Sequence, residues 1–220
     1  MLPFTSDQFL ANLAAYNQAI WPVQLAAFGL GGCAVVLLLL RPAMADRLIT
    51  AILAAMWLWT GIAYHWLYFS QINRAAVVFG ALFVAQSVLL ANSGIRKQLG
   101  FGRDFGPAMG VGIAFVGYAI VLYPLIGIWT GHAFPRMPAF GVTPCPVTIF
   151  TFGLFLLARQ PLSRPLLAIP SIWSLIGGSA AFLLGVQQDW MLLASGIIAV
   201  PLIVLGDRRP SSEPGAQKPA

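Results

Sequence analysis

Three reactive side chains are widely spaced in a largely apolar sequence: the thiol of Cys145, the imidazole of His65 and the carboxylate of Asp189. A nucleophile, a general base and an acid that orients the base make up a hydrolytic site, so a shared location would permit catalysis. The 2 histidines, His65 and His132, are too few for a typical catalytic zinc site with its three protein ligands. We therefore assign no catalytic residue, metal or cofactor. A membrane-embedded enzyme or metal-handling protein using Cys145 and His65 remains an alternative.

The segment Thr143-Pro144-Cys145-Pro146 is the most distinctive local pattern. Two prolines that flank a cysteine remove backbone donors and are expected to unwind the start of a helix. Irregular backbone at membrane depth persists only where it is buried in protein or lines a wet cavity, and broken helices in transporters mark substrate sites. In the alternative interpretation, both prolines only shape the loop that enters the helix, and Cys145 is a small apolar filler.

The composition indicates the surroundings of these groups. Of the 220 residues, 59% are hydrophobic and 8% charged, whereas soluble domains carry roughly 25% charged residues. The apolar residues form blocks of about the ~17–25 residues that a membrane-spanning helix requires. The net charge of +6 arises from basic residues in the short gaps between the blocks, as in membrane proteins. We therefore predict an all-α helix bundle in the lipid bilayer and exclude nucleic acid as a partner.

The apolar blocks predict seven transmembrane helices. Residues 5–18 precede them and are expected to form an interfacial helix, capped by Thr5 or Ser6. We treat residues 1–205 as one transmembrane domain and expect residues 206–220 to be a disordered cytoplasmic tail, because they are rich in proline, serine and charge. The predicted spans cover residues 21–40, 48–69, 75–91, 106–129, 140–158, 162–184 and 190–205.

The basic residues predict the orientation of the chain. Ten of the 12 Lys and Arg residues fall in gaps on one side of the predicted bundle, and only Arg74 and Arg136 fall on the other. Since basic loops remain in the cytoplasm, the N-terminus is expected outside and the C-terminus inside. A missing or extra helix would mix the two sets downstream, so the separation supports seven spans.

An internal repeat would relate the second and third spans to the sixth and seventh. A shift of 116 residues aligns them without a gap, and duplication and chance similarity both remain open. Duplication would give a parallel 3+1+3 arrangement, which resembles the architecture of the SWEET sugar transporters. The matched pairs include Trp57 with Trp173, Gly61 with Gly177, Gln71 with Gln187, and Gly80 with Gly196.

Most polar side chains fall near the predicted outer ends of the spans. An ionisable group within the membrane indicates a functional site, although His65 could instead bond a carbonyl within an aromatic belt. Asp189 also has two interpretations, as a cap of the last helix or as a partner of Arg74 or His65. The candidate ligand-binding residues are His65, Tyr64, Asn73, Thr143, Cys145, Thr148, Gln187 and Asp189.

The favoured hypothesis is a transporter of a small molecule or ion, with its site in the outer half between the second, fifth and seventh spans. The second hypothesis is the enzyme or metal-handling protein described above. The third is a structural or assembly protein without a ligand, which would not require a polar cavity. A homo-oligomer is compatible with each of the three.

Several long motifs resemble a family of bacterial multi-pass membrane proteins that is known only as a domain of unknown function. The resemblance covers nearly the whole chain to about Leu205 and implies a protein of the bacterial cytoplasmic membrane, the cell inner membrane, without implying a substrate. The motifs are LPFTSDQFLANLAAYNQAIWP, AYHWLYFSQIN, FGALFVAQ, GVTPCPVTIFTFGLFLLA and IWSLIGGSAAFLLGVQQDW.

Overall fold

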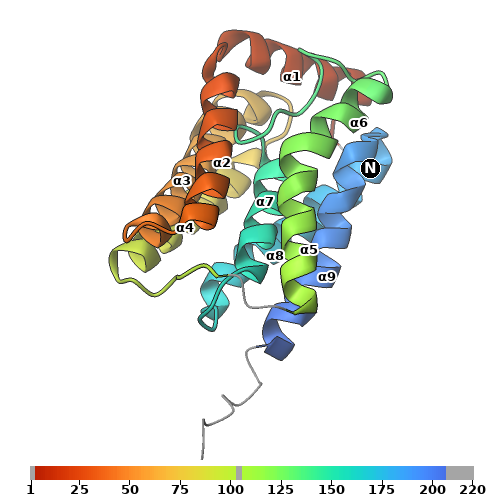
Figure 1. The fold of residues 1–220 in the computed structure, drawn as a ribbon. Helices are drawn as coiled ribbons and strands as arrows, with labels where there is room; N and C mark the ends of the chain where they lie inside the picture. The colour runs from red at the N-terminus through yellow and green to blue at the C-terminus, as the bar shows by residue number, and fades with distance from the viewer. Residues whose placement is uncertain (1–2, 103–105, 207–220) are drawn as a thin grey trace, which may run out of the picture.

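The computed structural model describes residues 3–102 and 106–206, which form a helix bundle (Figure 1). Within these residues no strand forms, and the only β-type pairing is one isolated bridge between Phe101 and Ala158. The helices are α1 (Ser6–Ala19), α2 (Val23–Leu40), α3 (Ala45–Trp59), η1 (Thr60–Tyr68), η2 (Phe69–Gln71), α4 (Ala76–Ile95), α5 (Pro107–Gly117), η3 (Tyr118–Leu122), α6 (Tyr123–Trp129), α7 (Pro144–Leu156), α8 (Arg164–Leu184), η4 (Gln187–Asp189) and α9 (Trp190–Gly206).

Six helical runs in the described residues are long and apolar enough to cross a membrane. They are Val23–Leu40, Ala45–Gln71, Ala76–Ile95, Pro107–Trp129, Arg164–Leu184 and Gln187–Gly206. Each corresponds to one predicted span, so the prediction of an all-α bundle with several apolar helices of membrane-spanning length is confirmed. The fifth predicted span differs, because its helix α7 has only 13 residues. At about 1.5 Å per residue α7 is ~20 Å long, less than the ~30 Å hydrocarbon core.

Helix α7 is the centre of the bundle (Figure 1). All 13 of its residues are buried, and it packs against α3, α5, α8 and α9. The chain remains buried without interruption from Met137 to Leu157. A glycine on each helix permits the close approach of α5 and α7, since a Cβ on Gly153 would lie 2.9 Å from the carbonyl oxygen of Gly112. No face of α7 is therefore exposed on the outside of the bundle.

The loops that precede α3, α5 and α8 lie together at one end of the bundle, here called the basic end. Asp46 accepts a hydrogen bond from the Phe101 amide at 3.0 Å and forms an ion pair with Arg159 at 3.1 Å. The described basic residues of this basic end are Arg41, Arg47, Arg96, Lys97, Arg159 and Arg164, whereas Arg74 and Arg136 belong to the opposite end. Arg103, Arg208, Arg209, Lys218 and the predicted tail beyond Gly206 lie outside the described residues. The orientation across a membrane and the duplication remain predictions.

Helix α1 lies across the opposite end, the α1 end (Figure 1). Thr5 caps it as predicted: its hydroxyl accepts from the Gln8 amide at 3.2 Å, and Gln8 Oε1 accepts from the Thr5 amide at 2.9 Å. The buried face of α1 holds Phe9, Asn12, Leu13, Tyr16 and Asn17. Asn17 Nδ2 donates to the carbonyls of Pro135 and Met137, both at 2.7 Å. These bonds attach the irregular segment before α7 to the helix that covers it.

Candidate functional site

Two π-helical segments approach the α1 end and were not predicted from the sequence. The first, η1, continues α3 and contains Tyr64 and His65. The second, η3, continues α5 and ends directly before α6. The second residue of α6 is Pro124, which has no backbone N–H to donate to a carbonyl of the preceding turn. A π-segment inserts a residue into a helix and rotates the side chains that follow it, and such segments are frequent at functional sites. Both segments direct aromatic side chains into the same end of the bundle.

The start of α7 differs from the sequence expectation. Helix α7 begins at Pro144, with Thr143 as its cap residue in an extended conformation, so the prolines begin the helix and do not unwind it. The irregular backbone precedes the helix, over residues 130–143. Proline is well tolerated in the first helical turn, where amide donors have no partner within the helix. Pro144 and Pro146 leave only the Cys145 amide as a donor in the first three positions, which lowers the cost of burying this helix end.

A buried acid lies beside the start of α7. Asp189 is 3% exposed and accepts a hydrogen bond from the hydroxyl of Tyr123. The thiol of Cys145 also faces this carboxylate. The only ion pair in the described part of the chain is that of Asp46 with Arg159 at the basic end. The alternative pairing of Asp189 with Arg74 or His65 is therefore not formed, and the carboxylate has no basic partner.

His65 occupies a cage of aromatic rings. Its ring centroid lies 4.7 Å from that of Phe83 and 5.1 Å from that of Trp173. Tyr64, Phe69 and Phe79 complete the cage. His65 is fully buried, and neither ring nitrogen has a hydrogen-bond partner. The structure thus excludes the interpretation in which His65 bonds a carbonyl within an aromatic belt.

A cavity of about 250 Å³ opens between these groups, here called the α1-end cavity. It brings together five of the eight predicted ligand-binding residues, namely Tyr64, Asn73, Thr143, Cys145 and Asp189. His65 does not line the cavity, but its ring packs against Trp173, and Trp173 does line the cavity. The tertiary structure therefore groups residues that are separated by more than a hundred positions in the sequence.

Two predicted residues lie elsewhere. Thr148 is one turn into α7 and donates to the Pro144 carbonyl at 2.8 Å, away from the cavity. Gln187 is exposed, whereas its neighbour Gln188 is fully buried with both side-chain polar atoms unpaired. Trp173 and Tyr123 were missed as site residues. Two sequence features could have identified them. Trp173 is paired with Trp57 in the 116-residue shift, and Tyr123 lies near the outer end of the fourth predicted span.

Tyr16 connects α1 to the cavity walls. Its hydroxyl donates to the Val142 carbonyl at 2.6 Å and accepts from Trp59 Nε1 at 2.9 Å. Burial raises the pKa of Tyr16 well above its ordinary value, so this hydroxyl remains protonated and available as a donor. The Tyr16 ring also packs edge-on against Tyr64, at 5.3 Å between centroids. Helix α1 thereby holds both Tyr64 and the segment that leads to Thr143.

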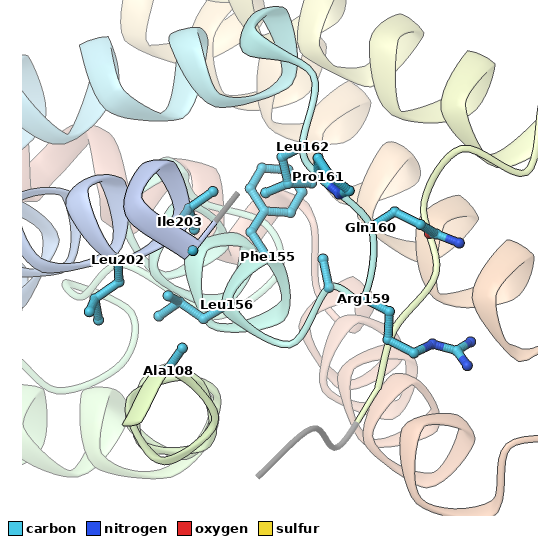
Figure 2. A pocket seen from close by; sticks show the side chains of 11 residues that line it. Ala108, Phe155, Leu156, Arg159, Gln160, Pro161, Leu162, Leu202 and Ile203 are labelled. Atoms are coloured by element: carbon cyan, nitrogen blue, oxygen red, sulfur yellow. The ribbon is translucent and has the colours of Figure 1, made fainter. Parts of the chain in front are cut away.

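A second cavity, of about 340 Å³, lies at the basic end between α5, α7 and α9. Figure 2 shows the Arg159 side chain extending away from Phe155 and Leu156, consistent with its ion pair to Asp46. None of the described residues that line this cavity has a buried polar side-chain atom without a partner. The α1-end cavity, which is lined by the buried acid Asp189 and by Trp173 with its unpaired Nε1, is therefore the stronger site candidate.

The site does not form the contacts of the catalytic alternative. Cys145 lies beside a carboxylate, and no hydrogen bond joins it to His65, whose ring nitrogens are both unpaired. The predicted nucleophile Cys145 and the predicted base His65 are therefore not joined as the catalytic alternative requires. Within the described residues no group of three or more His, Cys, Asp or Glu side chains is placed to hold a metal ion.

Comparison with known proteins gives one match. The model of a family of unknown function (DUF6064) matches residues 6–213, and the chain belongs to that family. This confirms the resemblance to an uncharacterised family. Neither a curated protein nor a solved structure matches the chain.

Proposed function

We propose that this member of the DUF6064 family is a multi-pass transporter of a small molecule, with its binding site in the α1-end cavity. One observation carries the proposal: the cavity contains a buried carboxylate, Asp189, that has no basic partner in the described part of the chain. Burial of a carboxylate in an apolar interior costs several kcal/mol unless a cation or hydrogen-bond donors compensate it. Ionisable groups inside membranes therefore mark substrate or ion pathways.

A seventh crossing of the membrane is part of the proposal. The 13 helical residues of α7 do not span the bilayer by themselves. The buried run from Met137 to Leu157 adds irregular backbone at the α1 end. Such backbone is tolerated at membrane depth when protein surrounds it or when it lines a cavity. The charge separation then orients the cavity toward the outside of the bacterial cytoplasmic membrane.

The scaffold hypothesis is less well supported by the same geometry. A protein that only holds partners together gains nothing from an aromatic cavity with a buried acid that has no basic partner, because burial of that charge lowers its stability. The π-segment η1 lines the cavity through Tyr64, and η3 faces Asp189 through Tyr118; such segments are frequent at functional sites. Transporters use this combination of a central site and interrupted helices to change access.

Uptake into proteoliposomes tests the proposal. The purified chain is reconstituted and offered a defined mixture of amines, amino acids, sugars and carboxylic acids, with mass spectrometry of the vesicle contents. Ala180→Phe places a ring in the cavity wall of α8, and Ala168→Phe adds the same ring at an exposed position on that helix. We expect accumulation of at least one probe class with the wild type and Ala168→Phe, and none with Ala180→Phe. A folded wild type without accumulation, or an unaffected Ala180→Phe, would overturn the proposal.

A further inference from the structure

The walls of the α1-end cavity combine aromatic rings with a single acid. Trp173, Tyr64 and Phe79 line it, with Asp189 as the one charged residue among the described lining residues. The remaining rings of the wall are those of Phe4, Phe9 and Phe69. Aromatic faces carry partial negative charge and attract ammonium ions, most strongly where water is excluded. The cavity is therefore electrostatically complementary to a cation with apolar substituents.

The groups that face Asp189 carry no positive charge. On one side, Asp189 faces Tyr123 of α6 and Tyr118 of η3. On other sides, it faces Cys145 of α7 and Tyr64 of η1. A hydroxyl or thiol can donate a hydrogen bond to the carboxylate but does not neutralise it. A cationic ligand would supply the missing counter-charge, and the low dielectric of the site would strengthen the attraction.

A second unpaired group in the wall indicates a further feature of the ligand. The indole Nε1 of Trp173 is buried without a conventional hydrogen-bond partner and lies near the sulfur of Cys145, a weak acceptor. A buried donor without a partner costs about 1–3 kcal/mol in proteins. An oxygen on the ligand would satisfy this donor.

We propose that the α1-end cavity binds a small organic ammonium ion that carries a hydroxyl or carbonyl oxygen. The ammonium group lies against Asp189 and the aromatic wall, and the oxygen accepts from Trp173 Nε1. The volume of about 250 Å³ admits an amino alcohol of the size of choline and excludes large lipids. This inference rests on the proposed function and specifies its substrate class.

Paired probes test the charge separately from the shape. The full chain in detergent is titrated by calorimetry with choline and with dimethylbutanol, its neutral isostere in which carbon replaces nitrogen. Wild type should bind choline at least about tenfold more tightly. Asp189→Asn should remove that preference, whereas Asp46→Asn, the same change at the basic end, should retain it. Trp173→Phe should weaken both probes, because both carry the oxygen.

The outcomes separate the inference from the function on which it rests. Equal binding of both probes to the wild type would overturn the ammonium assignment and leave a neutral ligand for the same cavity. Binding of neither probe to folded protein would also overturn the assignment, while the uptake assay would still decide transport. If Asp189→Asn fails to fold, Phe79→Leu replaces it, and an unchanged choline preference in that variant would contradict the aromatic wall.

Discussion

Tyr123 donates its hydroxyl hydrogen bond to Oδ1 of Asp189, which joins α6 to the turn before α9 across 66 positions of the sequence. The same end of the bundle contains a second bond of this kind, from the Tyr118 hydroxyl to the Gln188 carbonyl at 2.8 Å. Two tyrosines of one helical run thus hold η4, the short turn that carries the acid. The position of Asp189 in the cavity depends on the π-segment that turns both tyrosines toward it.

A double-mutant cycle should measure the coupling between Tyr123 and Asp189. Tyr123→Phe removes a donor from the buried Asp189 carboxylate and should lower the free energy of unfolding by about 1–3 kcal/mol, whereas Asp189→Asn also removes a buried charge without a basic partner and should lose less. Because the two residues share one interaction, the double variant should lose less than the sum of the two changes. Unfolding in mixed micelles with increasing SDS measures all four proteins. Additive losses would contradict the hydrogen bond.

A methyl group at Gly153 should separate α5 from α7. Its Cβ would lie 2.9 Å from the Gly112 carbonyl oxygen, which is too close for an unstrained contact. Overpacking of this kind typically costs about 1–3 kcal/mol. Gly110→Ala is the matched control, because its Cβ would meet nothing within 4 Å. We expect the SDS midpoint to fall for Gly153→Ala only, and equal midpoints would refute the close crossing.

His65→Phe should leave stability unchanged or raise it. Both ring nitrogens of His65 lack partners, and a phenyl ring would remain within the same aromatic cage without that cost. Trp57→Phe provides the contrast, since Trp57 Nε1 donates to the Thr151 hydroxyl at 2.9 Å and its loss should destabilise by about 1 kcal/mol. Thermal unfolding of both variants checks this. A marked loss in His65→Phe would reveal a hydrogen bond of the imidazole in solution.

Cysteine labelling should identify which end of the bundle faces outward. Ala133→Cys introduces a thiol at the α1 end and Gln98→Cys at the basic end, both at exposed positions. The background lacks both native thiols (Cys33→Ala, Cys145→Ala). A membrane-impermeant maleimide should label Ala133→Cys in intact cells and Gln98→Cys only after permeabilisation, because basic loops remain in the cytoplasm. The reverse pattern would invert the predicted orientation.

Local sequence patterns were enough to predict a membrane protein, the six long apolar helices to within a few residues and the Thr5 cap of α1. These features are local: a helix satisfies its own backbone hydrogen bonds, and the bilayer sets the length of the apolar block. The candidate site could be predicted in part, since depth along the spans pointed to Tyr64, Cys145 and Asp189.

Which of these residues meet depends on how the helices pack. It placed α7 at the centre, positioned Tyr123 against Asp189 and surrounded His65 with rings, whereas Gln187 remained outside the cavity. The two π-segments were equally inaccessible to sequence patterns, because their residues are ordinary helix-compatible types. The physical reason is common to all of these features. Side chains on different helices come into contact through the rotation and crossing of whole helices, which depend on packing between segments far apart in the chain.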